Sequence, residues 1–411
     1  CLALAIMAHE ARRYALGEWL LRRVVAAAPD DGEGWLMLGS VLYAQGRVVE
    51  AGLAHEEAQR RGLATPGHHA NALLYLNYRH DLPAAEIARR HRDWGAAHGG
   101  VVARTAPFAN SPDPGRRLRI GYLSPDFRHH SVSYFLQPLI EAHDRAGFEI
   151  HAFAHVEKPD GLTEHYRRLV DGWHDVRRLD DAALARLIEA RRIDILVELA
   201  GHTGGSRLPV CALRPAPVQA SWLGYPNTTG LPAMDWRLVD AVTDPPGAEA
   251  LAVERLYRLP DGFLCYRPSD KAPEVSPLPL PRQGHVTFGT FNNPAKLSPA
   301  AIACWSRILL ALPDSRLLLG SQVLTDPLFR SRLRRRFEQL GVPRRQLDLR
   351  AGVGDHRQHL LRYHEIDIGL DPFPYAGTTT TCESLWMGVP VVTLAGEAHV
   401  GRVGASLLHR L

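Results

Sequence analysis

The chain has 411 residues, of which 45% are hydrophobic and 22% charged, as is typical of a globular protein with two or three domains. Its formal net charge of +4 is too small and too dispersed to indicate a nucleic-acid partner. No run of about 18 apolar residues occurs, so we also expect no membrane partner.

Cysteine usage gives a prediction about the compartment. The five cysteines are Cys1, Cys211, Cys265, Cys304 and Cys382. Their number is odd and no two have the spacing of a metal site or a redox pair. We therefore expect reduced, mostly buried thiols in a cytoplasmic protein.

The first region, residues 1–100, is predicted to be helical. The stretch Trp35–Leu63 has the spacing of aromatic, Gly and Ala residues that is typical of a tetratricopeptide repeat. Ala85 falls one 34-residue period after Ala51, as a second copy would require. An ordinary array of helical hairpins is the alternative. Because the first repeat begins in mid-unit and the first residue is Cys1, we expect a fragment of a longer chain.

A different pattern begins after the Pro-, Asn- and Ser-rich stretch Thr105–Arg117. In 116–268, strand-like runs such as "LRIGYLS" and "IDILVELAG" alternate with helical stretches, which indicates a parallel sheet. A Pro-rich linker, expected to be irregular, covers 269–285, and the alternation restarts over 286–411. Helices are predicted at Tyr134–Ala146, Pro299–Leu312 and 326–340. We expect two Rossmann-like halves facing a cleft, with ligands at the carboxyl ends of the strands.

Four consecutive threonines, Thr378 to Thr381, stand where a helix is predicted to begin. Threonine is a mediocre helix former because its branched side chain loses rotamer freedom in a helix. The first N–H groups of a helix have no partners within it, and the helix dipole is positive there. Hydroxyls beside those amides predict an anion site suited to a phosphate. A threonine N-cap repeated by chance is the alternative.

Lys296 is one of three lysines among 48 basic residues, the others being Lys158 and Lys271. It lies between a predicted strand and a predicted helix, where a compact ammonium could neutralise a phosphate leaving group. A solvated loop lysine is the alternative. No GxxxxGK[ST] loop and no cluster with metal-ligand spacing occurs in these stretches. A diphosphate would then be held by a helix start and a lysine without a metal.

Two histidines, His129 and His130, follow the first predicted strand in "SPDFRHHSVSYF". Histidine titrates near neutral pH, so either could act as a base toward an attacking hydroxyl. The chain has 21 histidines, and this signal alone is weak. The Gly-rich "ELAGHTGGSR" ends another strand and could admit a ligand close to the backbone.

Several runs together resemble the O-linked N-acetylglucosamine transferases of the bacterial branch and the related SPINDLY proteins. They are "RIGYLSPDFRHHSVSYF", "ALRPAPVQASWLGYPNTTG", "FNNPAKLSP" and "PYAGTTTTCESLWMGVPVVTLAGEAHVGRVGAS". The resemblance implies N-terminal tetratricopeptide repeats followed by an α/β GT-B fold. It also implies further helices after Leu411, so we expect the last half to be incomplete.

The resemblance also implies a function. It predicts an inverting glycosyltransferase, without metal or cofactor, that moves N-acetylglucosamine from UDP-N-acetylglucosamine to Ser or Thr. The implied partners are the nucleotide sugar and a protein or peptide bound along the repeat groove. Three alternatives stay open: a protein O-fucosyltransferase using GDP-fucose, an N-glucosylating relative, and a repeat scaffold with an inactive transferase half.

Roles are implied for individual residues by the motifs they occupy. His130 matches a histidine proposed as the base, and Lys296 matches the lysine that neutralises the leaving diphosphate. Nucleotide-sugar contacts are implied for Leu223, Gly224, Asn293, Gly354, His356, His359, Arg362, Thr378, Thr379, Thr380 and Glu383. Animal relatives have a lysine where this chain has His356, and an aspartate where it has Glu383.

Overall fold

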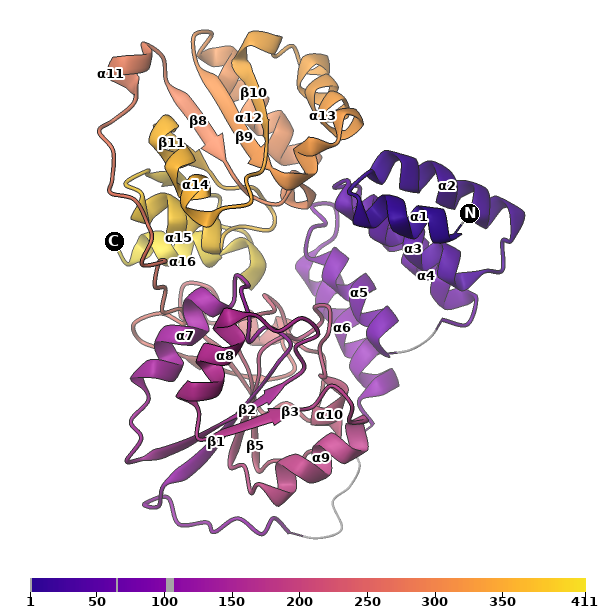
Figure 1. Ribbon diagram of the computed structural model, residues 1–411, viewed down its shortest axis with the longest axis vertical. Helices are drawn as coiled ribbons and strands as arrows, with labels where there is room; N and C mark the ends of the chain where they lie inside the picture. Colours follow the sequence, from indigo (N-terminus) through magenta and orange to yellow (C-terminus); the bar gives the residue numbers. More distant parts are fainter. Residues whose placement is uncertain (1, 64–65, 101–106) are drawn as a thin grey trace. The chain divides into compact units, whose positions relative to one another are not determined.

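The computed structural model of the protein describes residues 2–63, 66–100 and 107–411, which form two compact units (Figure 1). The first unit combines Cys1–Leu82 with Pro268–His409 and Leu411, and the second contains Pro83–Arg267 with Arg410. Helices come first in the chain and two parallel sheets follow, so the expected order of a helical region and two Rossmann-like halves is confirmed. Within the described ranges, no helix is long and apolar enough to cross a membrane.

The helical part of the first unit repeats its own geometry. Its helices are α1 Leu2–Glu10, α2 Tyr14–Ala27, α3 Gly32–Ala44, α4 Val48–Arg60 and α5 Pro66–Leu76. The residues before α2 and α4, Arg13 and Arg47, both have φ −90° and ψ 62°. These positions are one predicted period apart, so the two turns are structural copies of each other.

Close approach between α3 and α4 depends on small residues. A Cβ added to Gly39 would lie 2.2 Å from Cδ2 of the buried His55 ring. Ala51 and Ala58 on α4 are fully buried, and Leu38 and Val41 on α3 belong to the same apolar interior. A larger residue at Gly39 would separate the two helices.

The α/β part of the first unit holds a five-stranded parallel sheet in the order β10-β9-β8-β11-β12. Its strands are β8 Thr287–Thr290, β9 Arg316–Ser321, β10 Leu347–Ala351, β11 Ile368–Leu370 and β12 Val391–Val392. Its helices are α11 Leu280–Gln283, α12 Pro299–Ala311, α13 Pro327–Gln339, α14 His356–Leu361, α15 Thr379–Trp386 and α16 Val403–His409. The strand order reverses between β8 and β11, and ligands of such sheets bind at the carboxyl ends beside this point.

Side-chain caps place the helices of this sheet. Ser298 accepts a hydrogen bond from Ala301 N at 3.0 Å and so begins α12, while its hydroxyl donates to Phe373 O at 2.6 Å. Asp326 begins α13 by accepting from Leu328 N at 2.8 Å. The predicted helices at Pro299–Leu312 and 326–340 are thus confirmed as α12 and α13.

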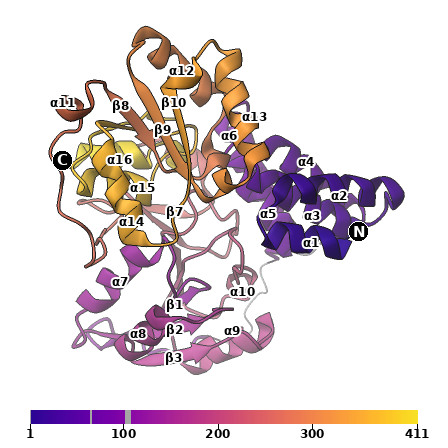
Figure 2. The same cartoon turned by 45° about the horizontal axis from the view of Figure 1, so that its top comes forward.

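The second unit is built on a seven-stranded parallel sheet in the order β3-β2-β1-β4-β5-β6-β7. Its strands are β1 Leu118–Ser124, β2 Phe148–Ala154, β3 Gly172–Asp175, β4 Ile195–Glu198, β5 Val218–Ser221, β6 Trp236–Val239 and β7 Arg255–Arg258. Strands β1, β2 and β3 lie side by side in Figure 2. Its helices are α6 Ala84–His98, α7 Ser133–Ala142, α8 Gly161–Leu169, α9 Asp181–Ala190 and α10 Pro209–Ala212. The order reverses between β1 and β4, which marks the corresponding position for a ligand.

Some details differ from the sequence expectations. Helix α6 ends at His98, close to the expected end of the helical region, but it groups with the second unit, where a 2.6 Å hydrogen bond joins its buried His91 to Tyr225. The Pro-rich stretch is irregular except for α11, and it packs on the first unit through a 2.9 Å bond from Leu280 N to Asp367. The predicted helix over Tyr134–Ala146 ends earlier, at Ala142.

The cysteine expectation is only half right. Cys211 and Cys382 are buried, but Cys265 and Cys304 are exposed, and all four are free thiols. A cysteine's position in the sequence does not show whether neighbouring elements will bury it: Cys304 lies on α12 and Cys265 in an irregular segment.

Candidate functional site

Lys296 ends a short 3₁₀ turn, Pro294–Lys296, that connects β8 to α12. Its ammonium donates a hydrogen bond to Gly377 O and lies 4.1 Å from the centre of the Tyr375 ring. Burial lowers the pKa of Lys296 from 10.5 to about 8, and the Asp371 carboxylate opposes this shift. The ammonium is therefore held beside the residue that precedes the threonine run, instead of extending into solvent.

The turn before α15 is fixed from both sides of Gly377. Its N–H donates to the two carboxylate oxygens of Asp371 at 2.9 and 3.1 Å, and its carbonyl accepts from Lys296. Thr393 also donates to Asp371 at 2.9 Å. Burial raises the pKa of Asp371, while the Gly377 amide and Lys296 act in the opposite direction. Gly377 has φ +62°, a conformation that glycine adopts without strain.

The threonine run forms the start of α15, as predicted. Thr378 is the N-cap, and its carbonyl accepts from Thr381 N and Cys382 N, both at 3.2 Å. Amides in the first turn, including those of Thr379 and Thr380, have no acceptors within an α-helix. With the Lys296 ammonium beside them, these amides and hydroxyls make a positive environment that suits a phosphate or diphosphate.

Three of the expected nucleotide contacts lie together on α14 and α15. Glu383 is buried, and its carboxylate lies 3.1 Å from Nε2 of His359 and 4.0 Å from Nδ1 of His356. Tyr363 also donates to Glu383 at 3.3 Å. A carboxylate held in this way can accept hydrogen bonds from paired hydroxyls, such as those of a ribose.

The structure shows fewer contacts for the other residues of this unit that were expected to bind the nucleotide sugar. Arg362 lies at the carboxyl end of β9, where its guanidinium would be 3.2 Å from a Cβ on Gly320. Gly354 is exposed, with open space around it. The side chain of Asn293 accepts from Ala295 N at 3.0 Å and so begins the 3₁₀ turn, whereas its neighbour Asn292 accepts from Thr380 Oγ1 at 2.9 Å. The structure thus joins Asn292, not Asn293, to the threonine run.

His130 follows β1 in the second unit. Its Nδ1 lies 3.5 Å from Asp126 Oδ2 and 3.3 Å from Val132 N. Burial lowers the pKa of His130, and the Asp126 carboxylate acts in the opposite direction. Burial therefore favours the neutral form of the imidazole. A proton on Nε2 lets Nδ1 accept from Val132 N, whereas a proton on Nδ1 faces Asp126 and leaves Nε2 free to accept from a substrate hydroxyl.

Leu223 and Gly224 form a tight turn after β5. Leu223 has φ +75°, which is uncommon for a residue with a side chain; such strained residues tend to cluster at functional sites. A Cβ on Gly224 would lie 1.9 Å from Leu199 O, so only glycine fits. The turn therefore packs directly on the carboxyl end of β4. There Glu198 accepts from Gly201 N at 2.7 Å, and burial raises its pKa to about 7.

Sequence reasoning missed five residues of these sites: Asp126, Asn292, Tyr363, Asp371 and Tyr375. Asp371 ends the run "IDIGLD", so its position at the carboxyl end of a predicted strand was a usable signal. Tyr375 carried no such signal, because its contact with Lys296 joins two loops that are far apart in the sequence.

Comparison with known proteins gives a consistent result. The model of glycosyl transferase family 41 matches residues 53–268 and 277–411. The SPINDLY proteins of Petunia hybrida and Arabidopsis thaliana, both named as probable UDP-N-acetylglucosamine–peptide N-acetylglucosaminyltransferases, are each 44% identical to this chain. The matches cover 82% and 83% of this chain but 37% and 38% of those proteins, so the chain spans a little over a third of their length.

A solved structure is also similar over the whole chain. It is a lysine mutant of the O-GlcNAc transferase from Thermobaculum terrenum, with 39% sequence identity and a TM-score of 0.94. The match covers 100% of this chain and 78% of that one.

Proposed function

Because this chain belongs to glycosyl transferase family 41, we propose that it carries the catalytic region of a protein O-glycosyltransferase. The donor we propose is UDP-N-acetylglucosamine, the acceptor is a Ser or Thr hydroxyl of a protein, and no metal takes part. The 44% identical relatives are named as probable UDP-N-acetylglucosamine–peptide N-acetylglucosaminyltransferases, which supports this donor. The observation that carries the proposal is the ammonium of Lys296 bonded to Gly377 at the start of α15.

Leaving-group stabilisation is the main contribution we assign to this unit. As the bond to the sugar breaks, negative charge grows on the diphosphate. Lys296 and the first-turn amides of α15 are already oriented toward such a charge, so little reorganisation is needed when it forms. Glu383, positioned by His359 and Tyr363, accepts from the ribose hydroxyls.

We assign the other reactant to the second unit. In the tautomer that carries its proton on Nδ1, toward Asp126, His130 accepts the proton of the attacking hydroxyl at Nε2, and Asp126 stabilises the imidazolium that results. Leu223 and Gly224 contribute backbone to the sugar pocket. A protein acceptor would bind along the helical repeats.

Replacement of Lys296 tests the proposal. We expect Lys296→Met to lower the transfer rate roughly a hundredfold, the usual effect of removing one group that stabilises developing charge. The matched control is Lys271→Met, because Lys271 is exposed in the Pro-rich stretch and should be dispensable. Transfer to a peptide library is measured by mass spectrometry, and circular dichroism verifies the fold.

The same assay separates the alternatives. It is run with UDP-N-acetylglucosamine, GDP-fucose and UDP-glucose, each with and without EDTA. Near-normal transfer by Lys296→Met contradicts the proposed role of the lysine. Transfer from GDP-fucose alone contradicts the proposed donor, loss of transfer in EDTA contradicts the absence of a metal, and no transfer from any donor favours the scaffold alternative.

A further inference from the structure

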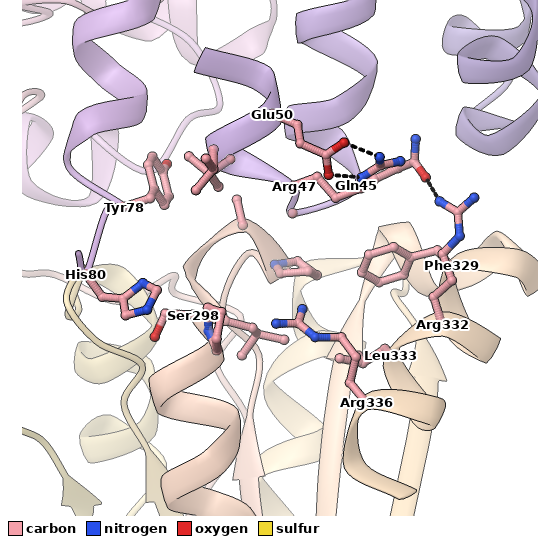
Figure 3. A pocket seen from close by; sticks show the side chains of 17 residues that line it. Gln45, Arg47, Glu50, Tyr78, His80, Ser298, Phe329, Arg332, Leu333 and Arg336 are labelled. Atoms are coloured by element: carbon pink, nitrogen blue, oxygen red, sulfur yellow. Dashed lines mark hydrogen bonds and ion pairs between the residues drawn. The ribbon is translucent and has the colours of Figure 1, made fainter. Parts of the chain in front are cut away.

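A cavity of about 360 Å³ lies within the first unit, between the α3–α4 turn and the helices α12 and α13 (Figure 3). Much of its wall is apolar, formed by Val48, Val49, Leu297, Pro299, Phe329 and Leu333. Sites for small molecules typically have this volume and combine an apolar wall with a few polar groups. Neither Lys296 nor any residue of α15 lines the cavity, so it is distinct from the proposed donor site.

The polar part of the wall is mainly cationic. Arg47 is paired with Glu50 and Glu18, and Arg332 is bonded to Gln45 (Figure 3). Arg336 differs, because none of the described residues forms a hydrogen bond or an ion pair with it. Its side chain rises from α13 with the guanidinium directed into the cavity (Figure 3).

The guanidinium of Arg336 is therefore available to a ligand that enters the cavity. Its partial burial lowers the pKa, yet a guanidinium stays protonated and presents five N–H donors. The preferred partner of such a group is a carboxylate or a phosphate bound in a fork geometry. The only acidic residue on the cavity wall among those described, Glu50, is already paired with Arg47.

One wall of the cavity is also the segment that carries Lys296. Pro294, Ala295, Leu297 and Ser298 line the cavity, while the Lys296 side chain leaves the same segment to bond Gly377. The Ser298 hydroxyl bonds Phe373 O, in the turn that leads to Gly377. A molecule bound against this wall would therefore contact a segment that is joined to both partners of the Lys296–Gly377 bond.

We propose that this cavity is an effector site for a small organic anion with an apolar body, such as a carboxylate on a hydrocarbon chain. The anion pairs with Arg336, the hydrocarbon contacts Val49, Phe329 and Leu333, and occupancy is transmitted to the donor site through the Pro294–Ser298 segment. Only this transmission depends on the proposed function. Binding of the anion in the cavity does not depend on the proposed function.

Binding is tested by titrating the whole chain with octanoate in a calorimeter, with 1-octanol and octylamine as matched neutral and cationic probes. We expect octanoate to bind, and Arg336→Met to weaken it about tenfold through loss of a charge-assisted hydrogen bond. Arg335→Met is the control, because Arg335 is exposed on the same helix and does not line the cavity. Val49→Trp should fill the cavity and block octanoate without touching Arg336.

Equal binding of octanoate and 1-octanol, or undiminished binding by Arg336→Met, would overturn the assignment of an anion. A concentration-dependent dimer that octanoate cannot dissociate would show that a second copy fills the cavity, and would overturn it too. Sedimentation of the chain with and without octanoate distinguishes this case.

Transmission is tested by titrating UDP with and without saturating octanoate. Coupling between two sites is reciprocal, so we expect at least a threefold change in UDP affinity in the unmodified chain and none in Arg336→Met. Unchanged UDP affinity with intact octanoate binding overturns the transmission. Octanoate binding without any UDP binding contradicts the proposed function and supports the cavity as a site of its own.

Discussion

Lys296 shows how single residues of this protein are tuned by their surroundings. Burial destabilises its ammonium, the Asp371 carboxylate stabilises it, and the balance is a pKa of about 8. Tyr375 lies 4.1 Å from the ammonium and offers an aromatic face, while Gly377 offers a carbonyl. The cation is therefore in position before any anion binds. Because its pKa of about 8 is close to neutral pH, the charged fraction of Lys296 falls at mildly alkaline pH.

This pKa predicts a pH dependence of nucleotide binding. Lys296 is charged below about pH 8 and loses its proton as the pH rises through that value. UDP affinity should thus be high at neutral pH and fall above pH 8. In Lys296→Arg, where the cation remains charged, the fall should be absent. Calorimetric titrations from neutral to alkaline pH measure the UDP affinity of the unmodified chain and of Lys296→Arg. If the affinity of both proteins falls equally at alkaline pH, a group other than Lys296 causes the fall.

Helices of the first unit are positioned by contacts with residues outside each helix as well as by their own sequence. Helix α15 begins with threonines, and its start is fixed by Asp371 and Lys296 from outside the helix. Helix α12 begins at Ser298, whose hydroxyl joins it to the loop after β11. In the helical region, α3 approaches α4 closely because Gly39 has no side chain.

Two glycines give a matched test of this packing. A Cβ at Gly39 would clash with His55, whereas one at Gly52 on α4 would meet nothing within 4 Å. We expect Gly39→Ala to destabilise the first unit by about 1–3 kcal/mol through overpacking. Gly52→Ala should stabilise it by about 0.4–1 kcal/mol, because alanine loses less backbone entropy in a helix. Thermal unfolding followed by circular dichroism measures the sign of the stability change in each variant. A destabilising Gly52→Ala would contradict the open space around Gly52.

At the scale of the whole molecule, the first compact unit is built from two segments that are far apart in the sequence. The N-terminal helices group with the α/β part that follows Pro268, and the residues between form the other unit. Several contacts join these distant segments: Tyr78 lies 4.8 Å from Tyr375, Ala15 N donates to Asp326 at 3.3 Å, and Arg332 bonds Gln45. Helices at the start of the chain thus support the loop that encloses Lys296.

This grouping predicts where a nucleotide will stabilise the protein. A ligand that binds only the native state of a cooperative unit slows the opening of that whole unit. Saturating UDP should therefore slow hydrogen exchange in α3 and α4 as well as in α12 and α15, and leave α8 and α9 unchanged. Hydrogen-exchange mass spectrometry measures these peptides, and protection confined to residues 286–411 would show that the helical region opens independently.

Much of the fold could be predicted from local sequence. The alternation of apolar runs and helical stretches predicted two parallel sheets, and the caps Ser298 and Asp326 stand where α12 and α13 were expected to begin. Thr378 was placed correctly at a helix start. These features depend on hydrogen bonds and periodicities within a few residues, which a single sequence displays directly.

Other features arise only when distant segments meet. The sequence determined by itself that a rare lysine and a threonine run follow two strands. The tertiary structure decided that Lys296 bonds Gly377, that burial and Asp371 set its pKa, and that Asn292 instead of Asn293 contacts Thr380. The physical reason is that burial and long-range contacts set pKa values and side-chain directions, and neither is encoded in any short stretch of the chain.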